Sequence, residues 1–81
     1  MSASIVKRSI SIAGHRTSIS LEEPFWEGLR AIAAAKDMSV QALVGEIDSG
    51  RGEQNLSSAI RVTVLRAALE GVLERKTNLG A

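Results

Sequence analysis

The pattern of hydrophobic and polar residues changes its period near residue 21, which divides the chain into a strand and a helical part. Between residues 16 and 21 apolar and polar residues alternate, which is typical of a strand that buries one face. The polar face carries Arg16, Ser18 and Ser20, and the opposite face carries Thr17, Ile19 and Leu21. After residue 21 the apolar residues recur with the spacing of amphipathic helices. The pattern therefore predicts a mostly α-helical protein with one N-terminal β-strand.

Three helices are expected after the strand. The first covers residues 23–36, with Pro24 in its first turn, and Asp37 is one of the few residue types that tolerate a left-handed conformation after a helix. Ser39 is a favourable N-cap for the second helix, which covers residues 40–48. The remaining segments are a loop, an additional C-terminal helix and a frayed tail, at residues 49–55, 56–76 and 77–81.

Residues 1–15 are expected to form a basic N-terminal arm ahead of a core at residues 16–48. The alternation within Ser9–Ile12 leaves open whether the arm becomes part of a β-ribbon. A hairpin within one chain is conceivable, but two strands alone are only marginally stable in water.

The composition limits how such a chain can be stabilised. With 81 residues it forms one domain with a small core, and proteins of this size often rely on disulfides, a metal or self-association. The chain has no cysteine and a single histidine, which excludes disulfides, thiolate metal sites and a histidine-based zinc site. Its apolar runs are too short for a signal peptide or a membrane span. We therefore expect a self-associating cytoplasmic protein with no membrane partner.

The charge is distributed unevenly along the chain. Residues 1–21 contain Lys7, Arg8 and Arg16 and no acidic residue, which gives +3, although the whole chain has a net charge of only +1. A local basic patch of this kind favours binding to a polyanion. A solvated basic tail explains the same charges equally well.

An enzyme is not expected. His15 is the only imidazole, no cysteine exists to pair with it, and no serine lies in a G-x-S-x-G nucleophile elbow. The chain has neither a phosphate-binding G-x-x-x-x-G-K-S/T motif nor a dinucleotide fingerprint. We therefore expect no catalytic residues, no cofactor and no metal.

The polar face of the strand is suited to the major groove of DNA. This groove is about 12 Å wide and accepts a two-stranded ribbon as well as a helix. Arginine contacts guanine in bidentate fashion, and serine can donate or accept a hydrogen bond at a base edge. Arg16, Ser18 and Ser20 are therefore candidate base contacts, although such residues are also common on any solvent-exposed strand.

Phosphate contacts are expected beside this strand. The N-terminus of the second helix presents free N–H groups and the positive end of the helix dipole, so Ser39 and Val40 are candidate phosphate contacts. Lys7 and Arg8 of the basic arm are the others.

With these features the chain resembles the ribbon-helix-helix family of bacterial DNA-binding proteins. The resemblance is carried by "RTSISL", "EEPFWEGLRAIAAAK" and "DMSVQALV", which together cover residues 16–44. The "GHRTSISLE" opening and "NLSSAIR" in the third helix are also similar to a small proteobacterial subgroup with an extra C-terminal helix. Thr17 departs from the family pattern, which usually has an apolar residue there, and Asp37 replaces a common turn glycine.

The resemblance implies a homodimer whose N-terminal strands pair as an intermolecular antiparallel β-ribbon. Arg16, Ser18 and Ser20 would then face the major groove, and the amides of Ser39 and Val40 would hold a phosphate. The dimer core would contain Ile19, Leu21, Leu29, Val40, Leu43, Val44 and Ile47.

The function expected from this resemblance is regulation of transcription by a homodimer bound to double-stranded DNA. The alternative is a protein-interaction or oligomerisation module, or an antitoxin-like partner, in which the ribbon serves only dimerisation. In that case the apolar third helix would contact the protein partner.

Overall fold

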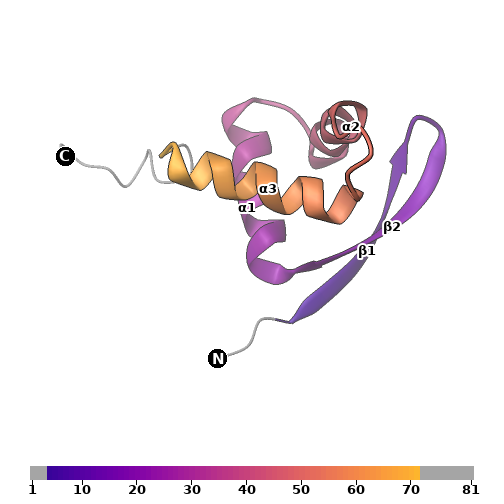
Figure 1. Cartoon of the computed structure of the whole chain (residues 1–81), viewed down its shortest axis with the longest axis horizontal. Helices are drawn as coiled ribbons and strands as arrows, with labels where there is room; N and C mark the ends of the chain where they lie inside the picture. The colour runs from indigo at the N-terminus through magenta and orange to yellow at the C-terminus, as the bar shows by residue number, and fades with distance from the viewer. Residues whose placement is uncertain (1–3, 72–81) are drawn as a thin grey trace.

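The protein consists of a β-hairpin followed by three helices that pack on one side of it (Figure 1). The computed structural model describes residues 4–71. The hairpin contains β1 (Ile5–Ile12) and β2 (His15–Glu22), and the helices are α1 (Glu23–Ala35), α2 (Val40–Gly50) and α3 (Leu56–Leu69). Helix α2 packs against β1, whereas α1 and α3 pack against β2. The predicted fold class, a mostly helical chain with an N-terminal strand and a third helix, is confirmed, and the structure adds a second strand, β1.

The turn between the strands has only two residues, Ala13 and Gly14. Both have positive φ, 52° and 84° respectively. A two-residue turn of this type matches the right-handed twist of the flanking strands and therefore joins them directly. The strands pair antiparallel from Ile12 opposite His15 to Ile5 opposite Glu22.

This hairpin gives β2 a partner strand within its own chain and shows that part of the expected arm belongs to the ribbon, a possibility that the sequence left open. In the structure β2 pairs with β1 of its own chain, so residues 5–12 of the expected arm are strand. Two strands alone would be marginal, but here the helices cover the inner face, where Ile10 of β1 is buried beside Ile19 and Leu21 of β2. The indole Nε1–H of Trp26 in α1 also donates a hydrogen bond to the Val6 carbonyl at 3.0 Å. Burial by distant helices thus stabilises a pairing that looks weak in the local sequence.

Helix α1 ends at Ala35, one residue earlier than expected, and is followed by the left-handed residue that the sequence predicts. Asp37 has the left-handed φ of 57°, its N–H donates to the Ala34 carbonyl, and the Met38 N–H donates to the Ala33 carbonyl. These two bonds satisfy carbonyls at the end of the helix and form a Schellman motif. The chain then reverses into α2, whose N-cap is Ser39, with its Oγ accepting the Ala42 N–H at 3.0 Å.

Helices α2 and α3 differ from the predicted bounds. Helix α2 continues through Gly50, two residues further than expected, and Arg51 holds the following turn by pairing with Asp48 at 2.7 Å. Helix α3 begins after the N-cap Asn55 and ends at Leu69, where residues to 76 were expected to be helical. Gly71, with φ of 83°, provides the left-handed conformation that commonly follows a helix end. The rest of the expected helix and the expected tail lie outside the described residues.

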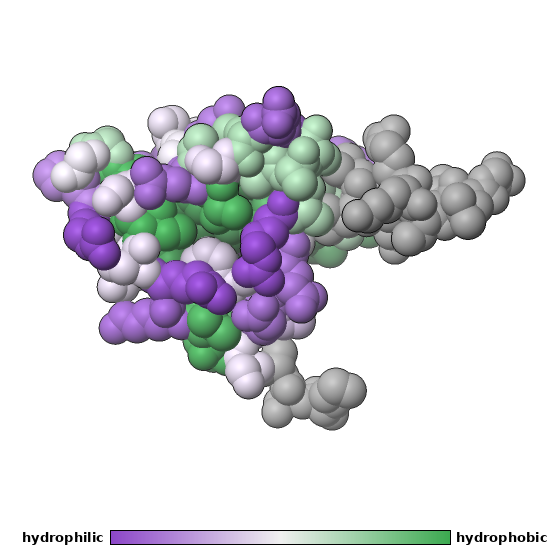
Figure 2. Space-filling view, turned by 180° about the vertical axis from the view of Figure 1, so that it is seen from behind, coloured by the Kyte–Doolittle hydropathy of each residue, from purple (hydrophilic) through white to green (hydrophobic). Residues whose placement is uncertain are grey.

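The core is a single apolar cluster between the inner face of the hairpin and the three helices. Trp26, Leu21 and Leu29 are among its largest fully buried side chains. The other members are Ile10, Ile19, Ile32, Ala33, Leu43, Val44, Ile60, Val64 and Ala67. Seen from behind, hydrophilic side chains border the hydrophobic areas of the surface (Figure 2). Within residues 4–71, no helix has the length and apolar character needed to span a membrane.

Candidate functional site

The hairpin face that points away from the helices is entirely polar over its central part, and we call it the outer face. Residues directly opposite each other in an antiparallel pair lie on the same side of the sheet. The register therefore places three cross-strand pairs on the outer face: Lys7 with Ser20, Ser9 with Ser18, and Ser11 with Arg16.

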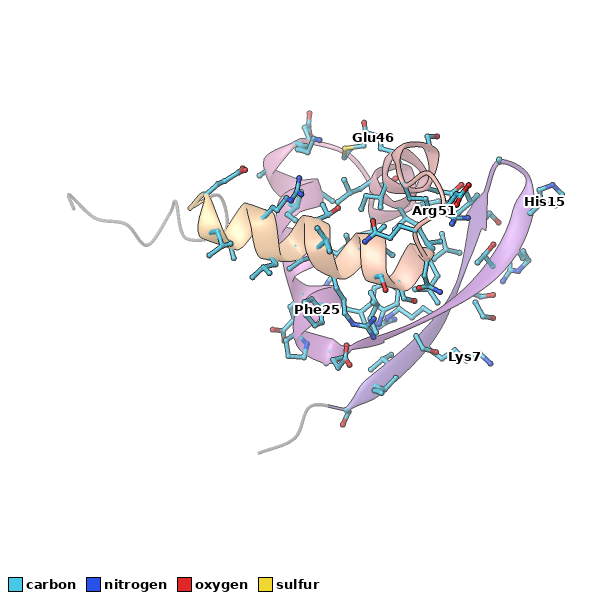
Figure 3. All side chains as sticks on the ribbon, in the orientation of Figure 1. Lys7, His15, Phe25, Glu46 and Arg51 are labelled. Atoms are coloured by element: carbon cyan, nitrogen blue, oxygen red, sulfur yellow. The ribbon has the colours of Figure 1, made fainter. Side chains whose placement is uncertain are left out.

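Side chains of the outer face are accessible to a ligand. Five of the six residues are exposed, and Ser11 is half-buried. Figure 3 shows Lys7 pointing away from the helices. Six hydrogen-bonding side chains with two cations thus form a narrow strip along the hairpin.

The cations of the hairpin are not neutralised by neighbouring acids. Within residues 4–71, no ion pair involves Lys7, Arg8 or Arg16. The acidic residue at the end of β2, Glu22, is paired instead with Arg61 of α3, at 3.0 Å from Nε to Oε1. A backbone hydrogen bond at Glu22, and then the hydrogen bond from Arg61, hold the pKa of this carboxyl below its usual value. The hairpin therefore keeps an uncompensated positive charge.

A hollow of about 530 Å³ lies between β1, α1 and the start of α2. Arg8 and Trp26 line it, with the Arg8 guanidinium over the indole ring at 5.4 Å from the ring centroid. Such stacking fixes the direction of the guanidinium and leaves its N–H groups free to donate. The remaining lining residues are Lys7, Ser9, Ile10, Arg30, Val40 and Gln41.

The first turn of α2 opens into this hollow. In the first turn of any helix the backbone N–H groups have no partner within the helix. Here Ser39 Oγ accepts one of them, from Ala42, while Val40 and Gln41 line the hollow beside the guanidinium of Arg8. N–H groups at a helix N-terminus bind anions, and a neighbouring cation strengthens the binding of the anion.

Arg16, Ser18 and Ser20, the predicted base contacts, lie together on the outer face. The predicted phosphate contacts are divided. Val40, Arg8 and Lys7 line the hollow, with Ser39 preceding it as the cap. Lys7 and Arg8 are successive strand residues, so their side chains leave β1 on opposite sides of the sheet. Lys7 therefore belongs to the outer face as well as to the lining of the hollow.

Sequence reasoning missed several residues of the site. Ser9 and Ser11 belong to the outer face, and their alternation with Ile10 and Ile12 was the available signal. Arg30 and Gln41 were missed because α1 and α2 bring them to the hollow from distant positions in the chain. No local pattern indicates that approach.

The residues expected in a dimer core lie largely inside this single chain. Five of them are buried in its own core: Ile19, Leu21, Leu29, Leu43 and Val44. Val40 and Ile47 are half-buried and pack against that core. Any dimer that keeps the fold of the chain must therefore use other surfaces for most of its contact area.

Comparisons with known proteins agree with this architecture. A family model described as "Ribbon-helix-helix domain" matches residues 5–68, which include the hairpin and almost all of the three helices. The chain is also similar to the solved structure of an uncharacterized protein from Bordetella pertussis Tohama I. The sequence identity is 34%, the TM-score is 0.73, and the match covers 98% of this chain and 65% of that one. This chain thus spans about two thirds of the length of that protein. No curated protein matches the chain significantly.

Proposed function

Because this chain belongs to the ribbon-helix-helix domain family, whose members are generally DNA-binding regulators of transcription, we propose that it binds double-stranded DNA and regulates transcription. The observation that carries the proposal is the outer face of the hairpin, a two-stranded polar strip whose two cations form no ion pair within the described part of the chain. A ribbon of two strands has the size of an element that enters the major groove.

In this proposal Arg16, Ser18 and Ser20 contact base edges. The arginine grips a guanine, and the serine hydroxyls donate to or accept from neighbouring bases. Serine contacts discriminate less between bases than arginine contacts do, so Arg16 contributes most of the sequence preference of β2.

A phosphate of the DNA backbone would lie at the hollow beside the hairpin. The Val40 amide, at the N-terminus capped by Ser39, and the guanidinium of Arg8 are the groups that would contact it. Such contacts fix the position of the hairpin on the duplex, while the base contacts give the sequence preference.

The test is fluorescence anisotropy of labelled random duplexes at two salt concentrations, with Arg16→Ala in parallel. We expect binding that weakens steeply with salt, because neutralised phosphates release counterions. Arg66→Ala is a matched control, since Arg66 is an exposed arginine of α3 that lies outside the hairpin and the hollow. An absence of binding by the wild-type protein at low salt would contradict the proposal.

We further propose that the protein acts as a homodimer. The surface that favours self-association is on α3, where Val62, Leu65 and Leu69 are exposed at a spacing that places them along one side of the helix. The same stripe supports the second candidate function, a protein-interaction module in which the hairpin does not contact DNA. The anisotropy measurement separates the two functions, since only the first requires the hairpin cations.

A further inference from the structure

Six consecutive residues of each strand of the hairpin are similar in sequence. Residues 7–12 read "KRSISI" and residues 16–21 read "RTSISL", so each position of β1 corresponds to the position nine residues later in β2. Lys7 corresponds to Arg16, Ser9 to Ser18, and Ser11 to Ser20. The alternation within each strand does not reveal this correspondence. The correspondence has a structural consequence because the two strands pair with each other.

The register turns this sequence repeat into an approximate two-fold symmetry. Ser9 lies opposite Ser18, and these two residues also correspond in the repeat. Exchanging the strands therefore carries the central pair onto itself and carries the Lys7–Ser20 pair onto the pair formed by Ser11 and Arg16. The pseudo-two-fold axis passes through the central serine pair, perpendicular to the sheet.

The cations lie at opposite ends of the outer face as a result. Lys7 and Ser11 are four residues apart on β1, which corresponds to about 13 Å along the strand. Because Arg16 lies opposite Ser11, the two cations are separated by about that length and lie on different strands. Base pairs of DNA rise about 3.4 Å each, so the face spans roughly four of them. The symmetry of the face matches that of a short palindromic sequence.

The size of the groove favours the hairpin of one chain as the reading element. Neighbouring strands lie about 4.8 Å apart, so a sheet of four strands, formed if two hairpins paired edge to edge, is about 14 Å wide between its outer backbones alone. The major groove is only about 12 Å wide. The two-stranded hairpin fits within this width, and the four-stranded sheet does not.

We propose that the hairpin of a single chain reads a short dyad-symmetric DNA subsite of about four base pairs, with Lys7, Ser9 and Ser11 as base-contacting counterparts of Arg16, Ser18 and Ser20. The proposal rests on the proposed function, since it requires that the outer face binds DNA. It adds β1 to the reading surface. It also changes the role of Lys7 from the phosphate contact expected from the sequence to a base contact.

Selection of duplexes from a random pool by the wild-type protein, followed by matched variants, tests this proposal. We expect the enriched sequences to share a palindromic core with a guanine near each end, on opposite DNA strands, because lysine and arginine both favour guanine. Affinity for the enriched duplex should then be measured for two pairs of variants, Lys7→Ala with Arg16→Ala and Ser9→Ala with Ser18→Ala. Thermal unfolding of each variant checks that these exposed substitutions leave the fold intact.

Both members of each pair should lose preference for the enriched duplex over a random one. For Lys7→Ala and Arg16→Ala the loss should be roughly 5- to 150-fold, the range that corresponds to one good base contact. A preference that is unchanged within two-fold in Lys7→Ala and Ser9→Ala, but lost in Arg16→Ala and Ser18→Ala, would overturn the proposal and leave β2 as the reading strand. A wild-type protein that binds no duplex at low salt would overturn this proposal together with the proposed function.

Discussion

Ala13 occupies a left-handed backbone conformation, with φ of 52°, which is unfavourable for a residue with a Cβ atom. Asparagine followed by glycine is the preferred pair in a two-residue turn of this type. We therefore expect Ala13→Asn to raise the free energy of unfolding by roughly 1 kcal/mol, measured by urea denaturation.

Gly14→Ala provides the opposite case for the same turn. No atom lies within 4 Å of the position where the new Cβ would be, so only the backbone conformation, with φ of 84°, opposes the substitution. It should lower the free energy of unfolding by roughly 1–2 kcal/mol. A stabilising Gly14→Ala, or a destabilising Ala13→Asn, would contradict the hairpin turn.

Glu22 makes the stability of the fold depend on pH. A backbone hydrogen bond at Glu22, followed by the hydrogen bond from Arg61, lowers the pKa of this carboxyl in the folded chain. Its contribution to stability is therefore fully present above the ordinary glutamate pKa of 4.5 that applies to the unfolded chain, and is lost as the pH falls through the lower pKa of the folded chain.

The effect can be measured as the free energy of unfolding of the wild-type protein and Glu22→Gln between pH 7 and pH 3. The wild-type protein should lose more stability on acidification than the variant does. Arg61→Gln should lose less stability on acidification than the wild-type protein but more than Glu22→Gln, because the backbone hydrogen bond at Glu22, the larger cause of the lowered pKa, remains. Identical pH dependence in the wild-type protein and Glu22→Gln would show that this carboxyl is not stabilised by the fold.

At the scale of elements, Trp26 connects β1 to α1. Its side chain is 1% exposed, and its Nε1–H donates to the Val6 carbonyl at 3.0 Å. Trp26→Phe keeps an aromatic ring but leaves this carbonyl without its donor, so we expect a loss of about 1–3 kcal/mol in the free energy of unfolding. Hydrogen exchange should accelerate more at the amides of β1 than at those of α3. Equal acceleration in both elements would show that Trp26 stabilises the core in general and not the attachment of β1.

The helices could be predicted from the sequence because their signals are local. Ser39 caps α2 and Asp37 adopts the left-handed conformation, as their residue types indicate. The end of α3 was missed because apolar periodicity continues in the sequence beyond Gly71, whose positive φ follows the helix.

The hairpin and the hollow depend on contacts between distant residues. From the sequence alone, two paired strands are expected to be only marginally stable. In the structure the three helices bury apolar surface against β1 and β2, and the sequence of the strands does not reveal this burial. Alternation within one strand groups Arg16, Ser18 and Ser20. Alternation likewise pairs Ser9 with Ser11, but only the register shows that these two serines lie on the same face as the residues of β2. The approach of Arg8 to the start of α2 was likewise beyond the reach of a local pattern.

At the scale of the whole molecule, the stripe on α3 is the surface on which the homodimer proposal depends. Leu65 and Leu69 are 54% and 77% exposed, so replacing them should leave the core intact. We expect the double variant Leu65→Gln/Leu69→Gln to weaken self-association at least ten-fold in sedimentation equilibrium, with little change in thermal stability of the monomer. The double variant Arg66→Gln/Ala68→Gln, at two exposed positions of the same helix outside the stripe, is the control for helix substitution. A dimer that is unaffected by loss of both leucines would place the interface elsewhere.

The cations of the hairpin and the hollow should determine how binding responds to salt. Each neutralised phosphate contributes about −0.9 to the slope of log affinity against log salt concentration. Arg8→Gln should therefore make this slope shallower by about 0.9 and weaken binding to all duplexes alike, because a phosphate contact carries no sequence information. A variant with an unchanged slope and an altered sequence preference would show that Arg8 contacts a base.

Contact between DNA and the outer face of the hairpin can be observed by titrating the ¹⁵N-labelled protein with its enriched duplex and following the backbone amide signals by NMR. We expect the changes to concentrate at residues 7–20 and at the first turn of α2, with little change in the amides of α3. Changes confined to α3, with the hairpin signals unmoved by saturating duplex, would contradict this expectation.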